Sequence, residues 1–275
     1  MLGPSSLPLQ QPPADWQPPV RSYAVCSAPR SGSNVLCDLL RRSGHAGLPR
    51  ELLHDRAWPA VRPSTATLME RLRQVGSTAN GVFAIKLFPA HLAHLEANYG
   101  IRFFDWFPGL SPVLLLRRDL LAQAVSLALA AQTGRWVKAD PVGREPRYDL
   151  AAIARMLDRL AEWESYWRRR FAIDGRDPLV LYYEDFAAAP LSGANSVLAW
   201  LGLPPLPEGT VGSDWLGSQS DALNRDWMER FRQDMRRQHY RLADRARPAR
   251  PGWRGLGDWL AGRLTRPPFQ LGRQR

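Results

Sequence analysis

Cysteine and lysine are scarce in this chain of 275 residues, and long hydrophobic runs are missing. The two cysteines, Cys26 and Cys37, lie in a strand-like and a helix-like run, so we expect buried free thiols and no disulfide framework. The only lysines are Lys86 and Lys138. No apolar run is long enough to span a bilayer, and the first twenty residues lack the basic and apolar parts of a secretory signal. These absences predict a soluble, cytoplasmic protein.

The excess of positive charge is confined to the C-terminal end. The formal net charge is +11, and residues 230–275 hold thirteen arginines against three aspartates, so the preceding body is nearly neutral. This distribution disfavours a nucleic-acid-binding domain, and we expect no specific nucleic acid partner. A basic tail over residues 243–275 that contacts an anionic membrane or a polyanion is retained as an alternative function.

Strand-like and helix-like patterns alternate along the chain after a proline-rich start. We expect residues 1–21 to form a flexible lead-in. Strand-then-helix order predicts an α/β domain over residues 22–242, with three α/β/α layers and a central, mostly parallel sheet. The expected pairs are Tyr23–Ser27 with Asn34–Arg42, Val82–Leu87 with Ala90–Asn98, Val113–Arg117 with Leu120–Ala131, and Leu179–Glu184 with Leu191–Leu201.

Two further helices are expected between and after these pairs. Residues Asp149–Phe171 place leucines and aromatic side chains at helical spacing, which indicates a core helix rather than an aromatic ligand platform. A polar helix is expected over Ser220–Leu242. The remaining residues, 243–275, are rich in glycine, proline and arginine, and predict a tail with one amphipathic turn.

The clearest functional signal lies between the first expected strand and its helix, at residues 29–34. Small residues at Ser31, Gly32 and Ser33 let backbone N–H groups turn inward around an anion, and the helix N-terminus adds partial positive charge. Arg30 adds a full charge, which an ordinary capped turn does not need. The segment therefore predicts a phosphate-binding loop. It lacks the lysine of the Walker A consensus, so a kinase or ATPase is less favoured.

The loop, within YAVCSAPRSGSNVLCDLL (residues 23–40), resembles the 5′-phosphosulfate loop of sulfotransferases. These enzymes have a P-loop NTPase-like fold and bind 3′-phosphoadenosine 5′-phosphosulfate (PAPS) without a metal. Three further segments, GLPRELL, RRDLLAQAVSLALAAQTGRW and QSDALNRDWMERFR, look like the bacterial trehalose 2-sulfotransferase family. The resemblance covers about residues 23–235 and also implies a homodimer.

The resemblance implies how the donor is bound. Sulfotransferases hold its 3′-phosphate with an arginine at a strand end and a serine on the next helix, and here those positions are Arg117 or Arg118, and Ser126. The family alignment favours Arg117, whereas Arg118 has the spacing of many other sulfotransferases. A solvated arginine pair is the alternative. The 5′-phosphosulfate group would be held by Arg30, Ser31, Gly32, Ser33 and Asn34.

The resemblance also implies the catalytic base and the acceptor site. Glu51 occupies the place of the family's proposed general base, although a charge at a helix N-terminus is the alternative explanation. The chain departs from the trehalose enzymes at Pro29 and at Leu52 and Leu53, so the acceptor is expected to be a carbohydrate or glycolipid hydroxyl without trehalose being specified. The expected acceptor-lining residues are Gly47, Leu48, Pro49, Arg50, Glu51, Leu52 and Leu53.

Other chemically capable residues carry weaker signals. His91 and His94 have the spacing of metal ligands, but no third ligand accompanies them, so we expect surface histidines and no metal. Lys86 at a strand end would stabilise the transferring group or, as the favoured alternative, be a solvated lysine. Residues 182–185 resemble the fourth-strand end of many sulfotransferases, and we interpret them as structural support.

Overall fold

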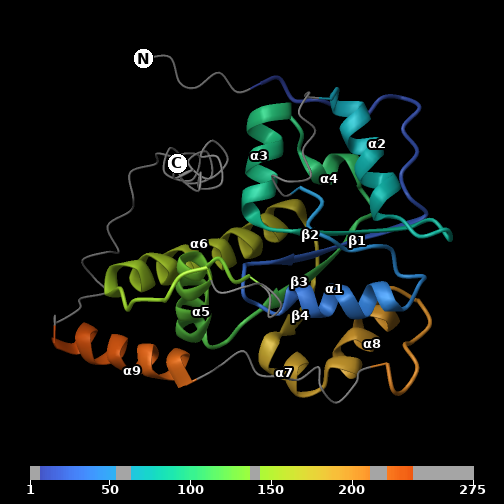
Figure 1. The fold of residues 1–275 in the computed structure, drawn as a ribbon. Coiled ribbons are helices and arrows are strands. Elements are labelled where there is room, and N and C mark those ends of the chain that lie inside the picture. Colours follow the sequence, from blue (N-terminus) through green and yellow to red (C-terminus); the bar gives the residue numbers. More distant parts are fainter. Residues whose placement is uncertain (1–6, 54–62, 137–142, 211–221, 238–275) are drawn as a thin grey trace, which may run out of the picture.

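The computed structural model describes residues 7–53, 63–136, 143–210 and 222–237. Its four strands form one parallel sheet in the order β2-β1-β3-β4, seen edge-on at the centre of Figure 1. The strands are β1 (Arg21–Ser27), β2 (Val82–Leu87), β3 (Ser111–Leu116) and β4 (Leu179–Tyr182). The expected parallel sheet is confirmed.

Helices cover both faces of the sheet, as the three-layer prediction requires (Figure 1). Alternate side chains of β1 enter opposite cores: Ala24 and Cys26 join one cluster, and Tyr23 and Val25 join the other. The first core is closed by α2 (Thr65–Gly76), α3 (Pro89–Tyr99), α4 (Phe103–Trp106) and α6 (Leu150–Asp174). The second is closed by α1 (Ser33–Arg42), α7 (Tyr183–Ala188) and α8 (Pro190–Trp200).

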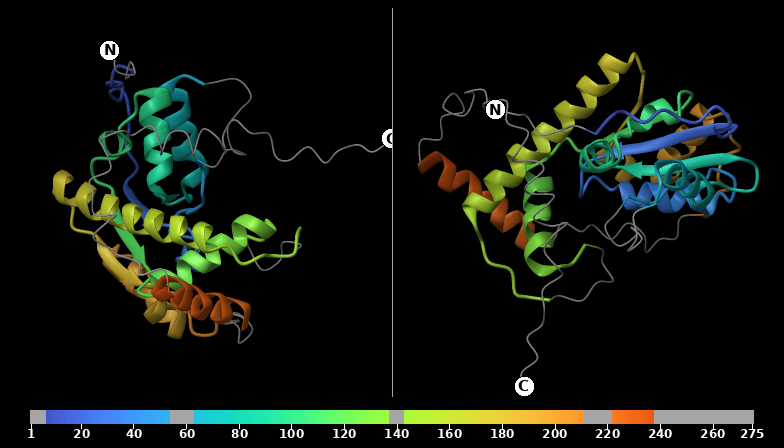
Figure 2. Two further views of the ribbon diagram at one scale, coloured as in Figure 1. Left: turned by 90° about the vertical axis from the view of Figure 1, so that its left-hand side faces the viewer. Right: turned by 90° about the horizontal axis from the view of Figure 1, so that it is seen from above.

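A third apolar cluster lies beside the sheet, where α5 (Leu120–Thr133) and α9 (Ala222–Arg237) pack against the first half of α6. The right-hand view of Figure 2 shows α9 next to the first half of α6 and away from the strands. Trp227 and Phe231 of α9 are buried in this cluster. Tyr148, just before α6, donates a hydrogen bond of 3.0 Å to Asp234, which fixes α9 in place.

Several element boundaries differ from those expected. The fourth strand ends at Tyr182, because Tyr183 begins α7, so the predicted strand Leu179–Glu184 was too long. The short helices α2 and α4 were not predicted. A signal for α2 was present, since the hydroxyl of Ser64 caps it by accepting from the backbone N–H of Thr67. Residues 220, 221 and 238–242 of the last expected helix, and the tail 243–275, lie outside the described residues.

Part of the proline-rich segment makes hydrogen bonds to the body of the domain. The indole N–H of Trp16 donates to the carbonyl of Trp106 at 2.9 Å, and the indole N–H of Trp106 donates to the carbonyl of Gln10 at 3.3 Å. The backbone N–H of Gln10 also donates to the carbonyl of Gly100. Gln10 and Trp16 of the expected lead-in therefore contact α4 and the residue that follows α3, while the flexibility of residues 1–21 stays a prediction.

The structure also tests the predictions for the two cysteines and for membrane-spanning helices. Cys26 and Cys37 are both buried free thiols, as expected, and burial raises the pKa of Cys37 to about 12. Within the described part of the chain, no helix combines the length and apolar character needed to cross a membrane.

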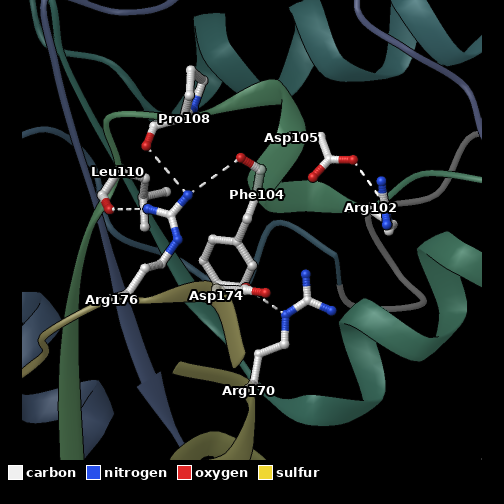
Figure 3. Close-up of polar contacts among 8 residues, drawn as sticks. All are labelled: Arg102, Phe104, Asp105, Pro108, Leu110, Arg170, Asp174 and Arg176. Atoms are coloured by element: carbon white, nitrogen blue, oxygen red, sulfur yellow. Dashed lines mark hydrogen bonds and ion pairs between the residues drawn. The ribbon is translucent and has the colours of Figure 1, made fainter. Parts of the chain in front are cut away.

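Arg176 ties the end of α6 to the turn that precedes β3 (Figure 3). Its guanidinium donates to the carbonyls of Leu110 at 2.7 Å, Pro108 at 3.2 Å and Phe104 at 3.5 Å. The cation also lies 4.9 Å from the centre of the Phe104 ring. Burial lowers the pKa of Arg176 from its ordinary value, so the bonds offset a desolvation cost. One side chain thus bonds to a carbonyl of α4 and to two carbonyls of the turn that follows it.

We expect Arg176→Met to lower the free energy of unfolding by about 1 to 3 kcal/mol, because half-buried carbonyls lose their donor. Arg102→Met is the matched control, since Arg102 makes a surface ion pair with Asp105 at 2.9 Å (Figure 3). Its loss is expected to cost less than about 1 kcal/mol. Urea unfolding measures both. Equal losses in the two variants would show that the carbonyl contacts contribute little.

Candidate active site

The anion loop, residues 29–33, connects β1 to α1 at the carboxyl end of the sheet. Gly32 has a φ of 83°, and a Cβ there would lie 2.6 Å from the Tyr183 ring. Arg30, with a φ of 66°, has the only positive φ of a non-glycine residue within the described ranges. The hydroxyl of Ser31 is buried and makes no hydrogen bond. The loop is therefore a tightly packed turn in which the buried Ser31 hydroxyl is available as a hydrogen-bond donor.

Helix α5 holds this loop through its side chains. The Nε of Arg30 donates to the hydroxyl of Ser126 at 2.9 Å, and its Nη1 donates to the carbonyl of Trp136. The amide of Gln123, itself buried, donates to the carbonyl of Pro29 at 2.8 Å. The sequence analysis did not identify Gln123 as a site residue. Its only signal is that it is a polar residue in an apolar helix, one turn before Ser126. The predicted residues Arg30 and Ser126 are brought into direct contact.

The two arginines after β3 point in different directions. Arg117 turns toward the loop: its Nη1 donates to the carbonyl of Arg30 at 3.2 Å, and its guanidinium lies 4.7 Å from the centre of the Tyr183 ring. Its Nε is buried without a hydrogen-bond partner. Arg118 instead forms a two-pronged ion pair with Asp185, at 2.7 and 2.6 Å. Only Arg117 faces the anion loop.

Charge accumulates where Arg117 meets the loop. Burial lowers the pKa of Arg30, and the neighbouring positive charge of Arg117 lowers it further. Two neighbouring guanidinium groups repel each other unless an anion compensates their positive charge. The end of the sheet near α5 is therefore a position that favours a bound anion.

Glu51 lies at the same end of the sheet, because the segment of residues 47–51 runs along the outer edge of β2. The backbone N–H of Lys86 donates to the carbonyl of Arg50 at 2.9 Å, and that of Leu48 donates to the carbonyl of Gly76. Gly47 has a φ of 70°, and a Cβ there would lie 2.7 Å from that of Ala84. The close approach fixes the path of the segment toward Glu51.

The other residues of the expected acceptor segment, 47–53, differ in exposure. Gly47 and Pro49 are buried, and Leu53 is buried in the core beneath the sheet. Leu52 is partly buried against the same core, whereas Arg50 is exposed. Arg50 is thus the one exposed residue of this segment, and Leu48, Glu51 and Leu52 are partly exposed.

A polar network links Glu51 to the anion loop, and its two donors, Lys86 and His91, are buried. The ammonium of Lys86 lies 2.7 Å from Oε2 of Glu51 and donates to Oδ1 of Asn34 at 2.6 Å. Nε2 of His91 lies 3.5 Å from Oε1 of Glu51. Asn34 follows the loop directly at the start of α1. Two residues therefore connect the candidate base to the candidate donor site.

Two sequence-based expectations are wrong in this network. Lys86 was expected to be a solvated strand-end lysine, and it is 5% exposed. His91 was expected on the surface, and it is 8% exposed. Both burials arise because Glu51 and Asn34, distant in sequence, compensate the desolvated donors. The pattern of residues along the chain contains no such information.

The network keeps Glu51 ionised. Burial alone would raise the pKa of this carboxyl, but the hydrogen bond from His91 and the charge of Lys86 outweigh it and hold the pKa at about 2. Within the described residues, no three His, Cys, Asp or Glu side chains are grouped as ligands for a metal ion. What the site offers is a carboxylate, a lysine and an arginine-flanked loop.

Comparison with known proteins assigns this chain to a family. The family model described as Stf0 sulphotransferase matches residues 22–234, which include every residue of the network and the loop. The chain belongs to the Stf0 sulphotransferase family. The family suggested by the loop and segment motifs is thereby confirmed.

Individual relatives of this Stf0 family chain are 26 to 29% identical to it over the matched residues. Trehalose 2-sulfotransferase of Mycobacterium tuberculosis is 29% identical over 256 residues, covering 78% of this chain and 95% of that protein. The enzyme of the same name from Mycolicibacterium smegmatis is 28% identical, covering 78% and 96%. Nodulation protein H of Rhizobium tropici is 26% identical over 204 residues, covering 68% and 78%.

A solved structure is also similar to this chain. The sulfotransferase from Alicyclobacillus acidocaldarius has a TM-score of 0.46 and 15% sequence identity, and the match covers 80% of this chain and 94% of that one.

Proposed function

We propose that this sulfotransferase moves a sulfuryl group from PAPS to a hydroxyl of a carbohydrate or glycolipid. The observation that carries the proposal is the link from Glu51 through Lys86 to Asn34, with contacts of 2.7 and 2.6 Å, which sets a carboxylate beside the anion loop. The names of two relatives, both trehalose 2-sulfotransferases, support a sugar hydroxyl as the acceptor. The departures at Pro29, Leu52 and Leu53 leave the sugar itself open.

The chain's own groups suit the two anionic ends of the donor. The loop backbone and the hydroxyls of Ser31 and Ser33 would hold the 5′-phosphosulfate group, and the buried, unpartnered Ser31 hydroxyl fits that role. Arg117, whose buried Nε also lacks a partner, would bind the 3′-phosphate together with Ser126. Both orphaned donors gain an acceptor when an anion binds.

The chemical step needs one proton acceptor and a stabilised leaving group. When bound, the donor supplies an activated sulfuryl group: the acceptor oxygen bonds to sulfur as the bond from sulfur to the 5′-phosphate oxygen breaks. Glu51 takes the hydroxyl proton, and Arg30 with the loop N–H groups stabilises the charge that grows on the released phosphate. Products are the sulfate ester and 3′-phosphoadenosine 5′-phosphate.

Lys86 reconciles this role with the low pKa of Glu51. A carboxyl with a pKa of about 2 is a weak base. The sulfuryl oxygens of a bound donor would attract the ammonium of Lys86 from Glu51 toward the loop, where Asn34 already accepts from it at 2.6 Å. Glu51 then becomes more basic only when donor is present.

Calorimetric titration with 3′-phosphoadenosine 5′-phosphate beside ATP tests the donor class. We expect tight binding of the first and weak binding of the second, because only the first carries a 3′-phosphate for Arg117. Preferential binding of ATP would reject the proposal. Sulfuryl transfer to trehalose and other sugars, followed by mass spectrometry, then identifies the acceptor.

Transfer is expected to survive an excess of EDTA. Arg30, Lys86 and the helix N–H groups offset the charge of the donor, and the described residues group no three His, Cys, Asp or Glu side chains as metal ligands. A nucleotide kinase is the alternative enzyme, and kinases need magnesium. Loss of turnover in EDTA that magnesium restores would favour the kinase.

A further inference from the structure

We propose that His91 is a positioning residue that fixes the orientation of the Glu51 carboxylate for proton acceptance. The inference rests on the proposed function, in which Glu51 is the base. His91 lies in the first turn of α3, and its Nε2 is 3.5 Å from Oε1 of Glu51. Hydrogen bonds to a catalytic carboxylate are often long before substrate binds and shorten afterwards.

The protonation of His91 follows from its second contact. The backbone N–H of Phe88 donates to Nδ1 of His91 at 3.1 Å. Because that N–H can only donate, Nδ1 must hold a lone pair, and the proton of a neutral imidazole is then on Nε2. The structure therefore directs an N–H of His91 at Glu51.

The imidazole is held rigidly in this orientation. It is 8% exposed, and it stacks on the Phe88 ring with centroids 5.2 Å apart and planes at 29°. Both ring nitrogens are committed, one as acceptor and one as donor, so the imidazole does not relay the proton. Its function is to orient one carboxylate oxygen.

The two oxygens of Glu51 consequently have different roles. Lys86 of β2 contacts Oε2 and His91 of α3 contacts Oε1. The thiol of Cys37 on α1 also lies within electrostatic reach of Glu51, whose charge helps to raise the pKa of that thiol. Lys86 has Asn34 as a second partner and is the exchangeable donor. His91 is the permanent one, so it keeps Oε2 directed toward the acceptor when Lys86 moves.

A matched pair of substitutions separates this role from helix capping. Asn at position 91 can place an oxygen near the Nδ1 position and keep the bond from Phe88, but it is too short to reach Glu51. Gln places an amide N–H near the Nε2 position and reaches Glu51, but it gives up the capping geometry. Hence His91→Asn tests loss of the Glu51 contact, and His91→Gln tests its rescue.

The first readout is the ¹³C titration of the Glu51 carboxyl, whose resonance is assigned because it disappears in Glu51→Gln. The second readout is sulfuryl transfer from PAPS to trehalose. In His91→Asn we expect the carboxyl to titrate at higher pH, because it loses a donor to its charged form. We expect kcat to fall by about 10- to 100-fold with little change in acceptor KM. His91→Gln should restore the titration and most of the turnover. His94→Asn, in the same helix, should match the wild type.

The ranking of the variants decides the proposal. Near-wild-type behaviour of His91→Asn with an impaired His91→Gln would show that His91 only caps α3, and equal behaviour of the two variants would also overturn the proposal. If His91→Asn does not fold, the titration and turnover of His91→Gln decide alone, since that variant keeps only the donor. If the wild type transfers nothing from PAPS to any sugar tested, the proposed function fails, while the titration still decides whether His91 controls Glu51.

Discussion

Turnover is expected to fall by about 10²- to 10⁴-fold in Glu51→Gln, with the affinity for 3′-phosphoadenosine 5′-phosphate nearly unchanged. Glutamine keeps the size of the side chain, and its amide oxygen can still accept from Lys86 or His91. It cannot take a hydroxyl proton at neutral pH. Steady-state kinetics and calorimetry together separate the loss of the base from a loss of donor binding.

The control for this variant concerns folding. Glu51 has a pKa of about 2, below the ordinary value of 4.5, so its charge stabilises the fold above that ordinary value, and the stabilisation is lost as the pH falls through about 2. Glu51→Gln removes it, and thermal unfolding at neutral pH must show that the variant remains folded. Glu162→Gln, at an exposed pair 3.8 Å from Arg159, is the surface control. Near-wild-type turnover in Glu51→Gln would exclude Glu51 as base and direct attention to His54, outside the described residues.

Arg117→Met is expected to remove the preference for 3′-phosphoadenosine 5′-phosphate over AMP. Hydrogen bonds to charged groups contribute about 1.5 to 3 kcal/mol, which corresponds to a loss of about 10- to 150-fold in affinity for the first ligand only. Methionine retains an aliphatic stem that can pack on Tyr183. Calorimetry with the two nucleotides measures the difference directly.

Arg118→Met is the matched partner of that variant. Arg118 is occupied by Asp185, at 2.7 and 2.6 Å, and is exposed, so we expect it to leave the nucleotide preference intact. If Arg118→Met removes the preference and Arg117→Met does not, the 3′-phosphate binds one residue further along. If neither variant changes it, the assignment of the nucleotide is wrong.

The sheet and the loop were predictable because their signals are local. Alternating strand and helix patterns specify which segments pair with which helices, and the small residues of 31–33 with Arg30 mark the loop without any tertiary information. The end of β4 was misplaced, since a continuous run of strand-like residues conceals where a helix begins. Tyr183 starts α7 and supports the loop through its ring, a role that no local pattern reveals.

The polar network was not predictable for a different reason. Lys86 and His91 are buried against partners that lie 35 to 52 residues away in sequence, Glu51 for both and Asn34 for Lys86. Isolated polar residues in a strand end or a helix are ordinarily exposed, so the general expectation fails wherever distant partners compensate them. The same is true of Gln123 and Arg176, whose partners are backbone carbonyls of other elements.

The left-handed backbone of Arg30 places a residue with a conformational cost at a position that we propose to serve activity. Glycine adopts a φ of 66° without a steric penalty, whereas a residue with a Cβ is disfavoured there by roughly 1–2 kcal/mol. A sequence optimised for thermal resistance alone would therefore carry glycine at position 30. Engineering that screens variants by melting temperature would tend to select against the guanidinium that we propose to stabilise the released phosphate, so heat tolerance is a misleading guide at this residue.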